Sequence, residues 1–175
     1  MASFTSSDNG QSIRIIIQQC LNASLQLQSL MDEREEKRYV RINRGIVVLL
    51  CFLKGASLDM IPKAVKAVLN IKLSELPDGS KVSVLDLPGD VLIVPQATLG
   101  GKMKGKSMQY HSNIAKHEAL PLYEEFTKLC QEMVLSDSKI TSGHTTSPQV
   151  KWGTYGSRQV LSVNTNGPYT HVMDF

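Results

Sequence analysis

The sequence predicts an α+β domain with a curved, mainly antiparallel sheet and two main helices. Strand-like stretches outnumber helical ones, and the two helical stretches separate groups of strands. A length of 175 residues with 42% hydrophobic content is enough for one domain with a core. We expect residues 12–175 to form that single domain and the polar residues 1–11 to be a disordered tail.

The first half of the chain reads as a series of strands. Residues 13–20 are rich in β-branched side chains, and residues 23–28 alternate apolar and polar side chains. Residues 32–38 carry charges of both signs, which is typical of a solvated hairpin loop. Residues 39–42 resume a strand, and residues 45–53 are apolar enough for a strand at the centre of the sheet.

A helix is predicted next, because apolar residues recur at the spacing of one helix face. Ser57 or Asp59 can cap this helix, and Pro62 then falls in or next to its first turn, where a missing N–H costs little. Its buried face is expected to consist of Ile61, Ala64, Val65, Val68 and Leu69.

Short strands and turns are expected after the helix. Residues 71–73 read as a short strand, and residues 76–80 read as a turn that contains Pro and Gly. Residues 82–85 and 91–99 read as two adjacent antiparallel strands. Residues 100–110, rich in Gly and Lys, are expected to form a flexible loop.

The second long helix is expected between about residues 113 and 135, and Pro121 either starts it or kinks it. Residues 136–148 are polar and loop-like, whereas residues 150–175 are rich in β-branched side chains and read as strands. The inward stripe of the helix is expected to contain Leu122, Phe126, Leu129 and Met133.

Composition restricts the possible classes of function. Charged residues make up 20% of the chain and the formal net charge is +3, which permits contact with nucleic acid without requiring it. Cys20, Cys51 and Cys130 show no C-x-x-C spacing and are expected to be buried thiols. No signal sequence or membrane-span pattern is present, so a reducing, cytoplasmic location without membrane contact is expected.

Side chains arranged for catalysis are not evident in the sequence. There is no G-x-S-x-G motif, and the four histidines lack the spacing of metal ligands. No phosphate-binding or dinucleotide motif is present. We therefore expect neither a metal nor a cofactor.

Two stretches are nevertheless distinctive. Residues 95–99 read PQATL at the end of an apolar run, and residues 165–170 read TNGPYT. Pro168 has a fixed φ and no N–H, while Gly167 lets another group approach the backbone closely. These residues alone favour an ordinary turn.

Both stretches resemble the motifs of the D-aminoacyl-tRNA deacylase family, which read SQFTL and N-x-G-P-x-T. Further pieces occur in the same order, including the first-strand run that ends at Gln18, Lys104-Gly105 and residues 153–156. The likeness covers about residues 13–175. Within the family, the chain most resembles the animal-specific tRNA deacylase branch, which carries PQATL and TNGP.

The resemblance implies a barrel-like sheet, a homodimer and a hydrolase that cleaves the ester of mischarged tRNA in trans. That ester is already activated, and a neighbouring ribose hydroxyl can assist the attacking water. The protein then needs to position the ester and stabilise the oxyanion, for which backbone groups suffice. The implied partner is the acceptor end of tRNA. The alternative is an RNA-binding module on the same scaffold without catalysis.

The resemblance also implies the residues of the site. The catalytic backbone would come from Gln96, Ala97, Thr98, Gly167 and Pro168, with Gly167 and Pro168 reaching in from the partner subunit. Thr98 is assigned to orientation, because a nucleophilic threonine needs a base and none is near in sequence. Substrate-binding residues would be Pro95, Leu99, Asn166, Tyr169 and Thr170, and the lysines at 102, 104 and 106 fit phosphate contacts or a solvated loop equally well. These three are Lys102, Lys104 and Lys106.

Three departures from the main family pattern bear on specificity. Gln19 replaces the usual arginine, Ala97 replaces the aromatic residue and Pro95 replaces the serine. Without the arginine to hold the glycine carbonyl, we expect a trans Gly167–Pro168 bond rather than the cis bond of the main family. A trans bond would leave room for a methyl group, so L-alanyl-tRNA, such as L-Ala on threonine tRNA, is expected as a substrate beside glycyl- and D-aminoacyl-tRNA.

Overall fold

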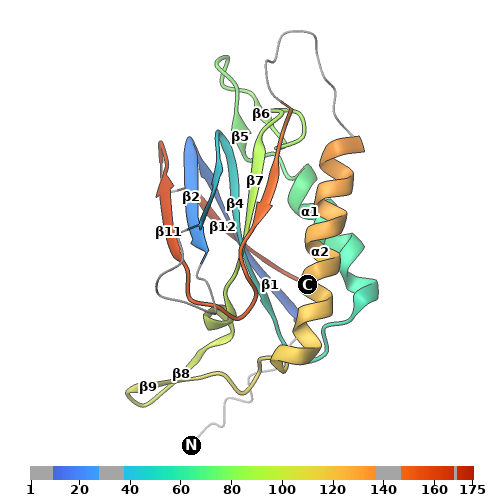
Figure 1. The fold of residues 1–175 in the computed structure, drawn as a ribbon, viewed down its shortest axis with the longest axis vertical. Helices are drawn as coiled ribbons and strands as arrows, with labels where there is room; N and C mark the ends of the chain where they lie inside the picture. The colour runs from blue at the N-terminus through green and yellow to red at the C-terminus, as the bar shows by residue number, and fades with distance from the viewer. Residues whose placement is uncertain (1–9, 28–37, 137–146, 168) are drawn as a thin grey trace, which may run out of the picture.

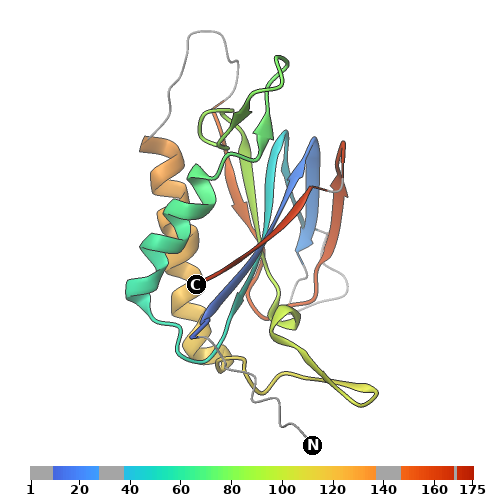
Figure 2. The ribbon, with the colours of Figure 1, turned by 180° about the vertical axis from the view of Figure 1, so that it is seen from behind.

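The computed structural model describes residues 10–27, 38–136 and 147–175, with the exception of residue 168. The chain forms three layers, which Figures 1 and 2 show from opposite sides. Two helices cover one face of a five-stranded sheet, and a three-stranded sheet covers the other face. This agrees with the predicted α+β class, in which antiparallel strand pairs predominate.

The five-stranded sheet has the order β10-β7-β4-β1-β12. Strand β1 pairs antiparallel with both β4 and β12, whereas β7 pairs parallel with both β4 and β10. The strands are β1 (Ile13–Cys20), β4 (Gly45–Phe52), β7 (Asp90–Pro95), β10 (Val150–Trp152) and β12 (Thr170–Asp174). As the long apolar run predicted, β4 lies at the centre of this sheet.

The three-stranded sheet has the order β11-β2-β3, with antiparallel pairing throughout. Its strands are β2 (Asn22–Leu27), β3 (Arg38–Ile42) and β11 (Val160–Asn164). A hydrophobic cluster that includes Leu25, Ile42, Val47 and Leu92 fills the space between the two sheets. A larger cluster lies between the five-stranded sheet and the helices.

Helix α1 (Ile61–Asn70) follows a short 3-10 turn, η1 (Leu58–Met60), and has Pro62 in its first turn. Its buried residues are the five that the periodicity predicted. The predicted cap is wrong, because no side chain caps either η1 or α1. Helix α2 (Lys116–Ser136) contains Pro121 in its interior, so this proline does not start the helix.

The predicted strands of the middle segment need correction. Residues 71–73 form no strand; the strand is β5 (Ser74–Glu75), which pairs with β6 (Lys81–Val82) around the predicted turn. The antiparallel pair 82–85 and 91–99 is also wrong. Hydrogen bonds from Leu87 to the Ser83 carbonyl and from Gly89 to the Val84 carbonyl fold that segment into turns instead.

Residues 100–110 are a hairpin rather than the expected flexible loop. Strand β8 (Lys102–Lys104) pairs antiparallel with β9 (Ser107–Gln109), and Gly105 takes a positive φ of 61° at the turn. Figures 1 and 2 show this hairpin projecting away from the three layers. The hairpin therefore presents its side chains to solvent on both faces.

All three cysteines are buried and free, as the sequence predicted. No helix among the described residues has the length and apolar character needed to cross a membrane. The predicted tail and the charged hairpin loop fall largely on residues 1–9 and 28–37, which lie outside the described residues.

Candidate functional site

Strand β7 ends at Pro95, and the chain then turns through η2 (Ala97–Gly100), a single 3-10 turn. The Gln96 N–H still donates to the Leu50 carbonyl of β4, at 2.8 Å, so the turn begins where the parallel pairing stops. Ala97 and Thr98 are exposed, whereas Gly100 is buried. The motif residues of the sequence analysis therefore lie at the edge of the sheet and face solvent.

Each backbone carbonyl from Gln96 to Leu99 accepts a hydrogen bond. The Gln96 and Thr98 carbonyls accept from the N–H groups of Leu99 and Gly101, at 3.2 and 3.1 Å. The Ala97 carbonyl accepts from the Asn113 side-chain amide at 2.7 Å. The Leu99 carbonyl accepts from the Arg14 guanidinium at 3.5 Å.

The first two backbone N–H groups of the same turn are free among the described residues. Within the part of the chain that the structure describes, the N–H groups of Ala97 and Thr98 have no hydrogen-bond acceptor. An exposed pair of adjacent N–H groups costs little in water and is available to a bound oxygen atom. The turn thus presents two neighbouring donors on a backbone whose carbonyls are fixed.

A pocket of about 370 Å³ opens beside these donors. This volume lies in the range of roughly 300–1,000 Å³ that small-molecule sites occupy. Residues 95–98 form one wall, and the facing wall comes from Tyr155, Gly156 and Arg158 in the loop between β10 and β11. Lys116, at the start of α2, adds a second cationic side chain to the lining.

The loop that carries Tyr155 is fixed by two side chains. Tyr123 of α2 donates its hydroxyl to the Gly153 carbonyl at 2.9 Å, and its ring lies 5.1 Å from the Tyr155 ring. Gln159 exchanges hydrogen bonds with the backbone of Thr154, at 2.8 and 3.1 Å. Burial raises the pKa of both tyrosines, so neither hydroxyl is an acid or base near neutral pH.

The backbone conformation favours glycine at position 156 of this wall. Its φ is +75°, in the left-handed region that disfavours residues with a Cβ. A Cβ here would also lie 2.2 Å from Cε of Lys116, but that atom belongs to the end of a flexible side chain that can move aside. This glycine belongs to the stretch 153–156 that resembles the family, but the sequence alone did not place it, Tyr155 or Asn113 in the site.

Gly167 lies in a different place, before β12 begins. Its carbonyl accepts from the Thr165 hydroxyl at 2.6 Å, from the Tyr169 N–H at 2.7 Å and from the Gln18 amide at 3.3 Å. Gln18 also accepts a hydrogen bond from the Thr170 hydroxyl. Although Gln19 stands where the arginine was expected, this carbonyl accepts hydrogen bonds from two other side chains, Gln18 and Thr165.

The predicted trans Gly167–Pro168 bond involves Pro168, which lies outside the described residues, so it stays a prediction. Asn166, Gly167 and Tyr169 line a pocket of their own together with Gln19 and Arg44. Apart from its chain neighbours, no described atom lies within 4 Å of the position that a Cβ would take at Gly167. This segment is thus open to an approaching group, as its lack of a side chain predicted.

The two motifs do not meet within one chain. The registers place Pro95 level with Ile15 and Thr170 level with Gln18. Thr170 and Pro95 are thus about 10 Å apart along the strands and about 14 Å apart across three strand spacings. Because η2 and Gly167 extend beyond these residues in opposite directions, the gap between them is larger still.

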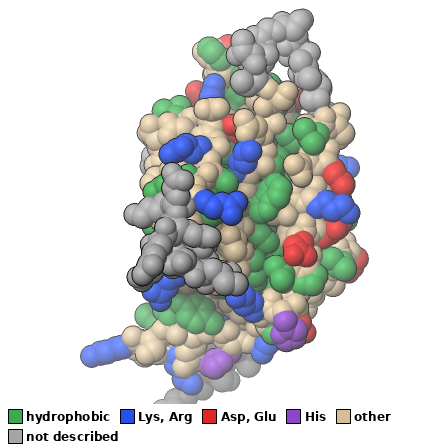
Figure 3. All heavy atoms as spheres, in the orientation of Figure 1, with side chains coloured by type: hydrophobic (Ala, Val, Ile, Leu, Met, Phe, Trp, Pro, Cys, Tyr) green, Lys and Arg blue, Asp and Glu red, His purple; other side chains and the backbone are tan. Residues whose placement is uncertain are grey.

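The three predicted lysines lie on the projecting hairpin, and all three are exposed. Figure 3 shows basic side chains along this hairpin, at the lower left of the view. Alternation along β8 puts Lys102 and Lys104 on one face, and Met103 faces the other way beside Met108. Met103 is 79% exposed.

No group of three or more potential metal ligands occurs among the residues that the structure describes. The nearest thiol, Cys51, lies 3.6 Å from the Ala97 carbonyl through its Sγ. Burial raises the pKa of Cys51, so the thiol is protonated at neutral pH and is a poor nucleophile. The chemistry available here therefore comes mainly from the backbone of η2.

The family model described as D-Tyr-tRNA(Tyr) deacylase matches residues 16–174. The chain belongs to this deacylase family. It is 56% identical to "D-aminoacyl-tRNA deacylase 2" of Danio rerio over 93% of this chain and 98% of that one. Its identity to "D-aminoacyl-tRNA deacylase 2" of Homo sapiens is 48% over 93% and 94% of the two chains.

A solved structure of a "probable eukaryotic D-amino acid tRNA deacylase" matches with a TM-score of 0.75 and 29% identity, over 94% of this chain and 100% of that chain. The predicted deacylase fold is therefore confirmed. As a member of the deacylase family, the chain is classed as a hydrolase that acts on aminoacyl-tRNA esters. The family relationship predicted from the two motifs is also confirmed.

Proposed function

We propose that this chain removes wrongly attached amino acids from tRNA in trans, by hydrolysing the ester to the terminal ribose. The observation that carries this proposal is the pair of unoccupied N–H groups at Ala97 and Thr98 beside the pocket. Fixed donors that point at a developing negative charge stabilise the transition state of acyl transfer. Family membership supplies the class of substrate.

The turn acts through its backbone. The ester carbonyl lies against the Ala97 and Thr98 N–H groups, which bind the oxyanion that forms when water attacks the carbonyl carbon. The neighbouring ribose hydroxyl of the substrate assists that water. The tied carbonyls keep the turn rigid, so the donors do not need to reorganise during the reaction.

The pocket beside the turn suits the terminal adenosine. Tyr155 is half-buried and offers a ring face on which a base can stack. Lys116 and Arg158 add positive charge next to the ribose and its phosphate. These groups would place the reacting ester over the turn, which is the positioning that the reaction requires.

A second copy of the chain completes the site. Gly167 lies too far from η2 to screen an ester bound there, so in this proposal it reaches the site of a partner subunit. Two observations support this homodimer: the distance between the two motifs and the open space around Gly167. The backbone at Gly167 and Pro168 then screens the substituent on the α-carbon.

The replacement of the family's aromatic residue by Ala97 bears on specificity. Ala97 is exposed at the mouth of the pocket, so its small side chain leaves space beside the ester. We propose that D-aminoacyl, glycyl and L-alanyl esters are accepted, whereas larger L-side chains are excluded. An enzyme with this specificity would act as a proofreader, and we propose that it does so in the cytoplasm.

The first prediction is that the chain releases glycine, a D-amino acid and L-alanine from tRNA, but not a large residue such as L-phenylalanine. The measurement is release of labelled amino acid from each tRNA at equal enzyme concentration. Binding of all four without release of any would instead support the RNA-binding module without catalysis.

The second prediction is that no side-chain nucleophile or metal is essential. Thr98→Ala should lower kcat/KM by about tenfold or less, because it removes one hydroxyl and leaves both N–H groups. Enzyme treated with a chelator should keep its activity. Complete loss of deacylation in either case, with folding and tRNA binding intact, would contradict the backbone mechanism.

The third prediction separates the roles of two glycines. Gly167→Ala should change the free energy of unfolding by less than about 0.5 kcal/mol, because the position is open. It should nevertheless lower kcat/KM at least about tenfold, since the added methyl group enters the partner's site.

Gly156→Ala is the matched comparison. It should destabilise the fold by about 1–2 kcal/mol, because its φ is positive. Thermal unfolding and deacylation of both variants test this contrast. Full activity of Gly167→Ala would contradict the proposed role of that segment.

The fourth prediction concerns the hairpin. Replacing Lys102, Lys104 and Lys106 by Ala should weaken tRNA binding and reduce the slope of log affinity against log salt, because fewer counterions are released. The measurement is a salt titration of tRNA binding. An unchanged slope would assign the hairpin lysines to a solvated surface.

A further inference from the structure

A second pocket lies on the other side of the η2 turn from the proposed ester site. Its volume is about 440 Å³. Gly100 and Gly101 form the side nearest the turn, and the other sides come from residues 10–12 before β1, Arg14 within it, the residues that follow β4 and the segment after β9. The proposed ester mechanism uses none of this space.

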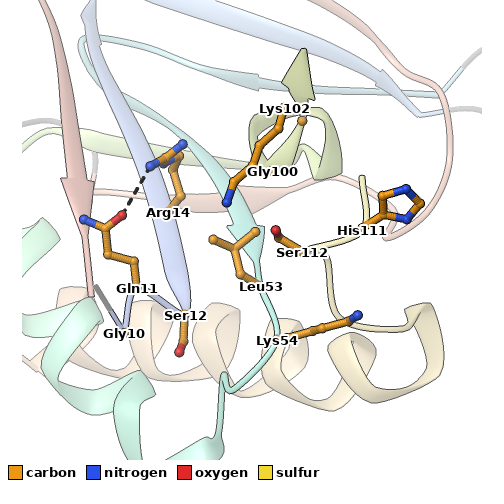
Figure 4. Close-up of a pocket in the computed structure, with 11 residues that line it drawn as sticks. Gly10, Gln11, Ser12, Arg14, Leu53, Lys54, Gly100, Lys102, His111 and Ser112 are labelled. Atoms are coloured by element: carbon orange, nitrogen blue, oxygen red, sulfur yellow. Dashed lines mark hydrogen bonds between the residues drawn. The ribbon is translucent and has the colours of Figure 1, made fainter. Parts of the chain in front are cut away.

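The pocket is basic. Arg14, Lys54, Lys102 and His111 line it, and no acidic residue occurs among the described residues of its lining. Figure 4 shows Arg14 and Lys102 on one side and Lys54 and His111 on the other, with Ser112 between them. Cationic and hydroxyl side chains that line one space favour an anion with several acceptor oxygens.

The positive charge is not fully balanced by the protein. Arg14 forms a bidentate ion pair with Asp174, with N–O distances of 2.8 and 3.0 Å, so much of its charge is neutralised. Lys54 is exposed and has no carboxylate partner among the described residues. A bound anion would therefore meet an uncompensated ammonium group at Lys54 in addition to the ion-paired guanidinium.

The position of the pocket indicates which anion it takes. Residues 97 and 98 line the proposed ester pocket, and residues 100 and 101 line the basic pocket, so only one 3-10 turn separates them. Lys102 begins the basic face of the hairpin and also lines the pocket. A strand of RNA that ends in the ester pocket must lead away from it past one of its neighbouring surfaces.

We propose that this basic pocket binds phosphodiester groups of the single-stranded 3′ end of tRNA, just before the terminal nucleoside. The hairpin then holds phosphates farther along the same strand, and the pocket fixes the last ones. Contacts to phosphate carry no base preference, so the pocket fixes the position of the ester without selecting the tRNA. This inference rests on the proposed function of the neighbouring site.

The test compares two substrates that carry the same ester. One is aminoacyl-tRNA, and the other is aminoacyl-adenosine, which has no phosphate. Lys54→Gln should lower the ratio of kcat/KM for the tRNA to kcat/KM for the adenosine ester by about tenfold, the expected loss for one charge-assisted hydrogen bond. A merely structural effect would reduce both values together and leave the ratio unchanged.

Lys66→Gln is the matched control, because Lys66 is also an exposed lysine and lies on α1 away from its buried face. It removes the same charge from a surface outside both pockets. A ratio unchanged in Lys54→Gln, or lowered equally in Lys66→Gln, would overturn the proposal. Thermal unfolding of both variants checks that each remains folded.

A binding measurement separates this inference from the proposed function. Binding of uncharged tRNA, followed by salt titration, needs no catalysis. Lys54→Gln should reduce the magnitude of the salt slope by about 0.7, the value for one phosphate contact to a single strand. If the wild-type chain cleaves no ester but the slope falls as expected, the proposed function fails and the phosphate pocket stands. An unchanged slope overturns the pocket.

Discussion

The register of β7 against β4 decides where the η2 turn lies. Gly45 pairs with Asp90 at the start of the two strands, and a Cβ at Gly45 would lie 1.8 Å from the Asp90 carbonyl oxygen. Only glycine allows this approach. The Asp90 carboxylate then accepts from the N–H groups of Asn43 and Gln149, both at 2.8 Å, and ties the start of β7 to both neighbouring segments. Five residues later the parallel pairing ends at Pro95, and the turn with the free donors follows.

Free N–H donors stabilise a developing negative charge effectively only if the turn that carries them keeps its conformation. An unoccupied carbonyl can rotate inward and exchange the roles of donor and acceptor, but here each carbonyl from Gln96 to Leu99 already has a donor. Two of those donors come from side chains on separate elements, Asn113 before α2 and Arg14 on β1. Electrostatic stabilisation depends on such fixed dipoles, because turning a dipole during the reaction costs free energy and reduces the net stabilisation.

Periodicity and short motifs predicted the parts of the fold that depend on local sequence. The buried face of α1 follows from helical spacing, and the strand ends of β1 and β4 follow from apolar runs. The parallel pairing of β7 was missed, because it is set by a close contact between residues 45 positions apart in sequence. The predicted strand over residues 91–99 was also too long, because β7 ends at Pro95. The local sequence does not show where the hydrogen bonding to β4 ends.

The sequence predicted only part of the candidate site, because the rest depends on contacts between residues far apart in sequence. The motifs gave one wall of the pocket, but Tyr155 and Asn113 reach η2 only through tertiary packing, and no spacing in the sequence relates them to it. The basic hairpin was predicted by composition, but its fold into β8 and β9 was not. The hydrogen bond that Gln18 donates to the Gly167 carbonyl was not predicted, because the two residues are 149 positions apart in sequence.

Strand β1 contacts both motifs of the proposed site. Arg14, near its first residue, contacts the carbonyl at the end of η2, and Gln18, near its last, holds the carbonyl of Gly167. Both side chains belong to one strand whose every residue pairs with β4. In the proposed dimer these two ends serve different sites, because Gly167 acts in the partner. In that proposal, the core of each subunit would fix the donors of its own site and the Gly167 carbonyl that faces the other.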